Sequence, residues 1–266
     1  MSVATPTADA GPGATAAQIL QRTGLQLLRT PQVLGIAVVQ SVVFLLMFRY
    51  VFGGAIGVEG VSYVDFLVPG FVVAGLIFTA GGSAVAVAED AASGVHDRLR
   101  SLPVRDLAVL TGRAVADTAL MVFVALVTLA LGVAVGFRFG GSALDALAAI
   151  GLLVVFALAF AWVFAWLGLV SGSAQAAQGL GIIGVPFSFL SSAFVPVDSM
   201  PGVLEVFAEY QPLTFMIDAV RGLLAGDAAT ATFEHGLSYY VTGSLLWSLA
   251  LVAAFAPLAV RAYRTR

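Results

Sequence analysis

The 266-residue chain has no cysteine and no lysine, and only 10% of its residues are charged. The absence of cysteine excludes disulfides, thiolate metal sites and a cysteine nucleophile. The absence of lysine makes all 12 basic residues arginine and excludes the phosphate-binding motif G-x-x-x-x-G-K-[ST]. The motifs H-E-x-x-H and G-x-S-x-G are absent too, and the net charge of -3 argues against nucleic-acid binding. The sequence therefore predicts no catalytic residue, no metal site and no cofactor bound by this chain.

Apolar residues are abundant instead, at 60% of the chain, against about 45–50% in an ordinary soluble domain. A soluble fold could not bury so much apolar surface, so we predict an all-α membrane protein. A membrane-spanning helix needs about 20 apolar residues. Six segments meet this length, at approximately residues 33–52, 66–88, 114–135, 147–170, 176–195 and 239–260.

The N-terminal region precedes this six-helix transmembrane domain, which we place at residues 32–262. Residues 1–16 are small, polar or helix-breaking and lack the pattern of a cleaved signal peptide, so we predict a disordered cytoplasmic tail. Residues 17–31 place leucine and isoleucine near one helical face, which predicts an amphipathic helix lying in the membrane interface. Pro31 ends this helix because it cannot continue the hydrogen-bond ladder.

The distribution of arginine predicts the orientation, because cytoplasmic loops are enriched in basic residues. With the N-terminus inside, nine of the 12 arginines fall on the cytoplasmic side. Both termini are then cytoplasmic, which requires an even number of crossings and agrees with six. The composition, rich in alanine, glycine and valine, suggests a bacterial genome, so we expect the bacterial cell (inner or plasma) membrane. The three arginines on the outer side are Arg49, Arg138 and Arg221.

Two connections between the predicted spans are unusually long. The inner one, residues 89–113, is polar and charged. The outer one, residues 196–238, contains two short apolar stretches separated by Pro212. Each stretch is too short to span, so we predict two half-helices that dip into the outer leaflet before the last span and pack against protein.

Charge inside the predicted spans is sparse. Asp117 lies one turn into the third span, four residues after Arg113, so the two side chains can pair on a helix. The pair is either structural, near the inner surface, or part of a transport path. No acidic relay runs through the spans, which argues against a proton-coupled carrier or a cation channel. A G-x-G-x-x-G match at 179–184 lies inside an apolar span, where close helix packing explains it better than nucleotide binding.

The inner segment 89–103 carries both signs of charge with apolar residues between them. It is either a solvated loop whose arginines only set the topology, or a short interfacial helix that docks into a cytoplasmic partner. Mixed charge around a small apolar face suits reversible docking. As a helix it would begin at Glu89 and Asp90, which the macrodipole favours, and end before Pro103.

Three features of the sequence occur in the order and spacing of a known family. An amphipathic stretch precedes the first span. The inner loop carries the pattern E…G…L…LP…R at Glu89, Gly94, Leu99, Leu102-Pro103 and Arg105. The outer stretch carries Ser192-Ala-Phe-Val-Pro196, Met200-Pro201, Gln211-Pro212-Leu213-Thr214 and then Arg221. On these features the chain resembles, from about residue 18 to residue 261, the membrane subunit of type 2 ATP-binding-cassette (ABC) exporters of the daunorubicin-resistance permease kind.

This resemblance implies that two permeases, identical or paralogous, face each other across a central pathway, surrounded by membrane lipid. Each would bind a separate cytoplasmic ABC ATPase subunit, on which ATP and Mg²⁺ are expected. The implied function is efflux of drugs, antibiotics or lipid-like molecules by a subunit that is not itself an enzyme. The residues implied to form the coupling helix to the ATPase are Glu89, Asp90, Gly94, His96, Asp97, Arg98, Leu99 and Leu102.

Two other classes of function compete with this one. A secondary carrier or channel not driven by ATP is disfavoured by the scarcity of charge inside the spans. An intramembrane enzyme is disfavoured because no cysteine, histidine or group of carboxylates lies within them. By the predicted topology, His96 and His235 lie on opposite sides of the membrane and cannot share a site in one chain.

Overall fold

The computed structural model describes residues 39–40, 42–52, 61–93, 106–230 and 233–265 of the chain. Within these residues every element of regular structure is a helix, in agreement with the predicted all-α class. The elements follow in the order η1 (Phe48–Phe52), α3 (Tyr63–Ala92), α5 (Asp106–Val135), α6 (Ala143–Val170), α7 (Ala174–Ile182), α8 (Gly184–Phe189), η2 (Val197–Ser199), α9 (Gly202–Tyr210), α10 (Pro212–Ala225), α11 (Asp227–Thr230) and α12 (Leu237–Thr265).

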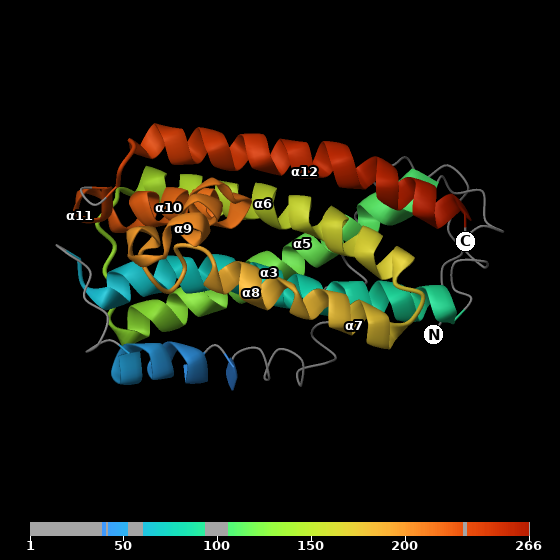
Figure 1. Ribbon diagram of the computed structural model, residues 1–266, viewed down its shortest axis with the longest axis horizontal. Coiled ribbons are helices and arrows are strands. Elements are labelled where there is room, and N and C mark those ends of the chain that lie inside the picture. Colours follow the sequence, from blue (N-terminus) through green and yellow to red (C-terminus); the bar gives the residue numbers. More distant parts are fainter. Residues whose placement is uncertain (1–38, 41, 53–60, 94–105, 231–232, 266) are drawn as a thin grey trace, which may run out of the picture.

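Four of these helices, α3, α5, α6 and α12, are long and apolar enough to cross a membrane. Their lengths of 28 to 30 residues correspond to about 42–45 Å at 1.5 Å per residue. The four helices run side by side, with α3 against both α5 and α6, and α12 against α6 (Figure 1). Each matches one predicted span, although α5 begins at Asp106 rather than at residue 114.

The predicted fifth span, residues 176–195, is two short helices rather than one continuous helix. The helix α7 ends at Ile182, and α8 begins again at Gly184 after a break at Ile183. Pro186 explains the break, because it has no N–H to donate to the carbonyl of Ile182 and its ring crowds that carbonyl. Together the two helices follow α3 along the bundle (Figure 1).

Of the predicted first span (33–52), residues 33–38 and 41 lie outside the described residues. Its described part is a short apolar helix, Val42–Val51, whose last turns are the π-helical element η1. The predicted interfacial helix (17–31) and the predicted cytoplasmic tail (1–16) lie wholly outside the described residues. Four spanning helices and several shorter apolar helices are therefore shown, and the count of six spans remains a prediction.

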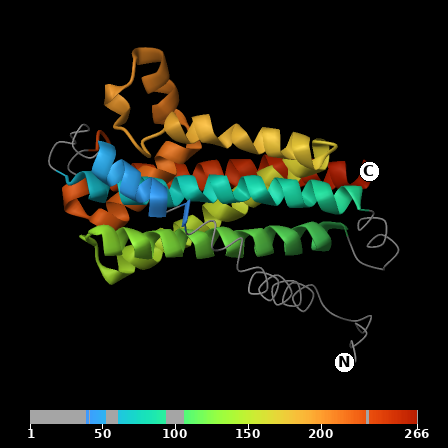
Figure 2. The ribbon, with the colours of Figure 1, turned by 90° about the horizontal axis from the view of Figure 1, so that it is seen from below.

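The long connection before the last span contains the two predicted short helices. Pro212 is the first residue of α10, a position where its missing N–H costs no helical hydrogen bond. Every residue of α10 from Leu213 to Ala225 is buried. The preceding helix α9 is mostly exposed, with Val203 87% accessible and only Ala208 buried, so the predicted packing against protein holds for α10 but not for most of α9. Figure 2 shows the segment around α9 standing out from the bundle.

Small residues allow the helices around α3 to approach closely. A Cβ added at Gly168 of α6 would lie 2.5 Å from the carbonyl oxygen of Ala84 on α3. One added at Gly181 of α7 would lie 3.2 Å from the Cα of Gly81. The turn 81–84 of α3 therefore packs closely against both α6 and α7, as expected where small residues mediate packing in a membrane.

Candidate functional site

The described ends of the predicted coupling segment belong to two long helices. Glu89 and Asp90 lie in the last turn of α3, and the N–H of Ser93 caps that turn by donating to the Glu89 carbonyl at 2.9 Å. The prediction that these two acids begin a helix is therefore wrong. A macrodipole effect of about 0.3–1 kcal/mol is too small to end an alanine-rich helix. The remaining coupling residues lie outside the described residues, namely Gly94, His96, Asp97, Arg98, Leu99 and Leu102.

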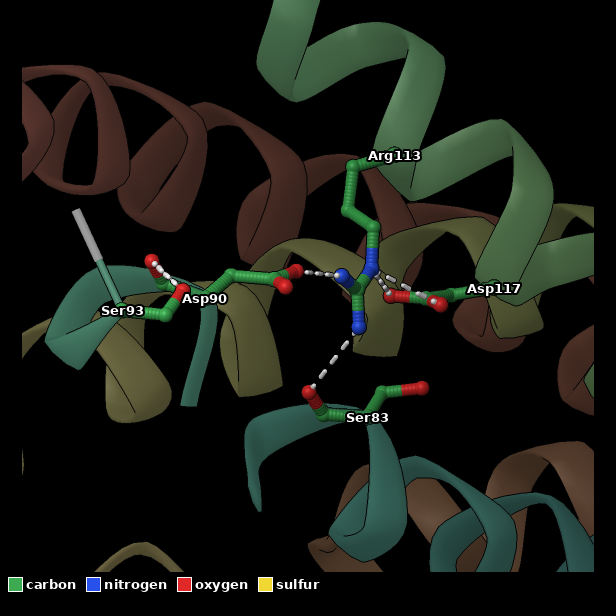
Figure 3. Close-up of polar contacts among 5 residues, drawn as sticks. All are labelled: Ser83, Asp90, Ser93, Arg113 and Asp117. Carbon is green, nitrogen blue, oxygen red and sulfur yellow. Dashed lines mark hydrogen bonds and ion pairs between the residues drawn. The ribbon is translucent and has the colours of Figure 1, made fainter. Parts of the chain in front are cut away.

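Arg113 of α5 binds two carboxylates, one on α5 itself and one in the last turn of α3 (Figure 3). Its Nη1 donates to Asp90 Oδ2 at 2.8 Å, and its Nε donates to Asp117 Oδ2 at 3.0 Å. Its Nη2 donates to the backbone carbonyl of Ser83 at 3.4 Å. We call Asp90, Arg113, Asp117 and the Ser83 carbonyl the Arg113 cluster. The spacing of the sequence indicated the contact with Asp117, but nothing in the sequence indicated the contacts with Asp90 and Ser83.

The two acids of the Arg113 cluster differ in their environment. The side chain of Asp117 is 9% exposed, whereas that of Asp90 is 46% exposed. A buried carboxylate is stable only when it is paired and hydrogen-bonded, so Asp117 depends on Arg113. Asp90 keeps access to solvent and contributes a weaker, exchangeable contact. The guanidinium therefore joins a fixed acid on its own helix to a more accessible acid on α3.

The Arg113 cluster contacts a turn of α3 that also packs against two other helices of the bundle. The carbonyl of Ser83 accepts a hydrogen bond from Arg113. Ser83 lies in the turn 81–84 of α3, which packs closely against Gly168 of α6 and Gly181 of α7. A displacement of Arg113 would therefore act on a turn that touches three other helices. The arrangement therefore links α5 to a turn of α3 that also packs against α6 and α7, and its members are an arginine, two aspartates and a backbone carbonyl.

A second charged network lies near the other end of α3, on the buried helix α10. Arg221 is 3% exposed and pairs with Asp218, while its Nε donates to the Phe66 carbonyl at 3.1 Å. Its Nη2 donates to the carbonyl of Ser192, and the hydroxyl of Ser192 donates to Asp218 Oδ1 at 2.9 Å. The guanidinium carbon also lies 3.8 Å from the centre of the Phe66 ring. We call Arg221, Asp218, Ser192 and the Phe66 carbonyl the Arg221 network.

Sequence reasoning placed Arg221 in an outer connection and did not find this network. One signal was available, since Asp218 and Arg221 are three residues apart in an otherwise apolar helix. The carbonyls of Phe66 and Ser192 come from segments far away in the sequence, so they could not be identified from spacing.

One group of described side chains could hold a cation. Ligand atoms of Glu209, Glu234 and His235 lie within 4.8 Å of one another at the junction of α9 and α12. The sequence analysis predicted no metal site and did not place these residues together. His96, the other histidine, lies outside the described residues.

Comparison with known proteins identifies the family. Residues 16–225 match the family described as ABC-2 type transporter. The chain is 34% identical over 230 residues to the daunorubicin resistance ABC transporter permease protein DrrB1 of Streptomyces coeruleorubidus, covering 86% of this chain and 78% of that protein. It is 27% identical over 230 residues to the probable doxorubicin resistance ABC transporter permease protein DrrC of Mycobacterium tuberculosis, covering 84% and 79%.

These matches and the four long apolar helices agree with the resemblance inferred from the inner loop and the outer stretch. The matched relatives are permease proteins of transporters, and the family implies a multi-pass membrane protein that works with an ATP-binding partner. The chain therefore belongs to the ABC-2 type transporter family.

Proposed function

We propose that this chain is the permease subunit of an ATP-driven exporter and that a separate cytoplasmic subunit binds ATP and Mg²⁺. The relatives are named for resistance to daunorubicin and doxorubicin. By extension, we propose efflux of drugs or lipid-like molecules. The chain would supply the pathway and perform no chemistry of its own.

The observation that carries this proposal is the Arg113 cluster. An ATPase subunit can move membrane helices only through an element that touches both. Residues 94–105 connect α3 to α5, and Arg113 joins those two helices through Asp90 at 2.8 Å. A push on the connection would therefore reach both α3 and α5, and α7 through the turn 81–84. We propose residues 89–102 as the segment that contacts the ATPase.

The buried acids support an ATP-driven permease over a proton-coupled carrier. Among the described residues, Asp117 and Asp218 are the buried carboxylates, and each forms an ion pair with an arginine. A proton carrier needs an acid that can lose its counter-ion during the cycle. The many contacts of Arg221 make such a release costly at Asp218.

The exposed face of α7 supports a dimer. Gln175, Gln178 and Gly179 are all accessible on this short helix, next to the exposed Ile182 and Ile183. An amide that faced hydrocarbon would lose its hydrogen bonds to water. This face is better suited to a second permease, or to a water-filled pathway between two permeases, than to lipid.

The arginine distribution supports an orientation with both termini in the cytoplasm. The last turns of α3 and α12 lie at the same end of the bundle (Figure 1), and they carry Asp90, which pairs with Arg113, and Arg261 and Arg264. At the other end of α3, the N–H of Arg138 donates to Asp65, and Arg49 lies beside Gly136, which follows α5. The enrichment of arginine at the first end is the pattern of a cytoplasmic face. The proposed location is the bacterial inner membrane.

The proposal is tested by purifying the tagged chain from its native membrane after mild cross-linking. We expect a protein with a phosphate-binding loop to purify with it, and we expect ATP hydrolysis by the complex but not by the chain alone. Robust ATP turnover by a preparation free of other subunits would contradict the proposal. So would the absence of any ATP-binding protein from the cross-linked complex.

A further inference from the structure

The end of α9 and the segment just before α12 bring three metal-binding side chains together. Glu209 is the last residue but one of α9, and Glu234 and His235 lie shortly before Leu237, where α12 begins. Ligand atoms of the three side chains all lie within 4.8 Å of one another. Carboxylate oxygen and imidazole nitrogen are common ligands of Zn²⁺. The fold therefore assembles a possible zinc-binding set from two segments that are distant in the sequence.

The two carboxylates of this set have no protein counter-ion. Among the described residues, neither Glu209 nor Glu234 forms an ion pair, and the chain has no lysine. Their charge acts on the neighbouring phenol, because the carboxylate of Glu209 is the main cause that raises the pKa of Tyr210. A divalent cation between the carboxylates would be attracted by both of them.

The imidazole distinguishes this site from an ordinary group of surface acids. The ring of His235 stacks on the ring of Tyr239, with 4.4 Å between centroids and 21° between planes. Tyr239 lies in the first turn of the long helix α12, so the imidazole rests on a fixed element. Mg²⁺ and Ca²⁺ prefer sites made of oxygen ligands, whereas imidazole suits Zn²⁺. The mixed set of one nitrogen and two carboxylates therefore favours Zn²⁺.

The helix α9 has few other attachments to the bundle. Of its nine residues only Ala208 is buried, and its main contacts are with η2 and α10, its neighbours along the chain. One ring contact reaches further, between Phe207 and Phe187 of α8, with 5.7 Å between centroids. Because α9 stands out from the bundle (Figure 2), a metal bond from Glu209 to the start of α12 would add a strong attachment at its end.

We propose that Glu209, Glu234 and His235 bind one Zn²⁺ ion and that this ion ties α9 to the start of α12. Zinc bonds of about 2.0–2.2 Å place tetrahedral ligand atoms about 3.4 Å apart. The side chains of Glu234 and His235 are exposed, so they can rotate to close the remaining distance. Water completes the four ligands. This site is separate from the proposed coupling role and does not depend on it.

The first test is direct binding of the metal. The full-length chain is purified in maltoside micelles without a polyhistidine tag, freed of metal with a chelator, and titrated calorimetrically with Zn²⁺ at about pH 8, where an ordinary imidazole is uncharged. We expect saturable binding of about one ion per chain, which excess Mg²⁺ or Ca²⁺ does not displace. The absence of saturable binding, or its displacement by excess Ca²⁺, would overturn the proposal.

Two variants and two matched controls locate the site. His235→Ala and Glu209→Gln should each weaken Zn²⁺ binding at least about tenfold, since loss of a ligand costs no less than loss of its outer hydrogen-bond partner. His96→Ala removes the other histidine of the chain, and Glu205→Gln removes a charge from α9 outside the set. Both controls should keep the affinity of the wild type. Unchanged affinity in His235→Ala and Glu209→Gln, each eluting as a monodisperse protein, would overturn the proposal.

A second measurement tests the tie between α9 and α12. Zn²⁺ should slow hydrogen–deuterium exchange of α9 in the wild type and have no such effect in His235→Ala. Peptides from α6, which supplies none of the three ligands, should exchange at the same rate with and without the metal in both proteins. Saturable binding of Zn²⁺ that leaves the exchange of α9 unaltered would overturn the proposed tie.

Discussion

The Arg113 cluster and the Arg221 network lie near opposite ends of α3, and each pairs an arginine with aspartate and with a backbone carbonyl. They differ in how far the arginine side chain is buried. The Arg113 side chain is 26% exposed and that of Arg221 is 3% exposed. Arg113 holds an accessible acid, Asp90, and one rather long bond to a carbonyl. Arg221 is enclosed by a carboxylate, two backbone carbonyls and an aromatic ring.

The difference in burial separates a contact between helices that can rearrange from a contact that holds helices in place. Water can replace Asp90 as a partner of Arg113, so the link between α3 and α5 can open at small cost. No such replacement is available to Arg221, whose loss would leave the Asp218 carboxylate buried and unpaired. We therefore expect movement at the Arg113 end of the bundle and rigidity where α10 meets α3.

The largest expected effect is at Arg221. Arg221→Leu should destabilise the protein by about 3–5 kcal/mol, because it leaves a buried charge without its partner. The double variant Arg221→Leu with Asp218→Leu removes both charges and should recover much of this loss. Thermal unfolding of the purified chain in micelles measures both effects. A single variant as stable as the wild type would show that the network does not fix α10.

A smaller effect is expected at Gly70, one helical turn from Phe66. A Cβ there would overlap the backbone of Ala193, so Gly70→Ala should cost about 1–3 kcal/mol by overpacking. Gly75 on the same helix has no neighbouring atom within 4 Å of an added Cβ. Gly75→Ala is therefore the matched control and should be neutral or stabilising by at most about 1 kcal/mol. Equal melting temperatures for the two variants would contradict the close packing of α3 on this segment.

The sequence predicted the long helices well because their signal is local. Hydropathy alone located the spans that became α3, α5, α6 and α12, and Pro212 correctly separated α9 from α10. It placed the start of α5 too late, because the polar first turns of that helix do not look like a membrane span. The break at Ile183 was missed, although Pro186 four residues after Ile182 is the kind of residue that produces one.

The charged sites were only partly predictable, for a physical reason. The pairing of Arg113 with Asp117 follows from helical spacing, so it could be inferred from sequence. The contacts of Arg113 with Asp90 and of Arg221 with Phe66 join residues 23 and 155 positions apart. Such contacts depend on how helices pack, and an arginine in a connecting segment is ordinarily expected in solvent.

The smallest expected effect is at Asp90. Asp90→Asn removes a half-exposed ion pair and should change the free energy of unfolding by no more than about 1 kcal/mol. Glu89→Gln, at the exposed neighbouring position, removes the same charge without breaking the pair and serves as its control. The two variants should melt within a few degrees of each other. A loss at Asp90 as large as that at Arg221 would remove the distinction between the two clusters.

We propose that Arg113 transmits movement from an ATPase subunit to the bundle. The direct measurement is the ATP-dependent change in hydrogen–deuterium exchange of α7 in the complex of the permease with its ATPase. The variant Arg113→Gln with Asp117→Asn removes both charges without leaving a buried acid unpaired, and Arg261→Gln, an exposed arginine at the same end, is the control. We predict that the change in α7 is lost in the double variant and kept in the control, with the ATPase still bound in both. An unaltered response of α7 in the double variant would contradict the account.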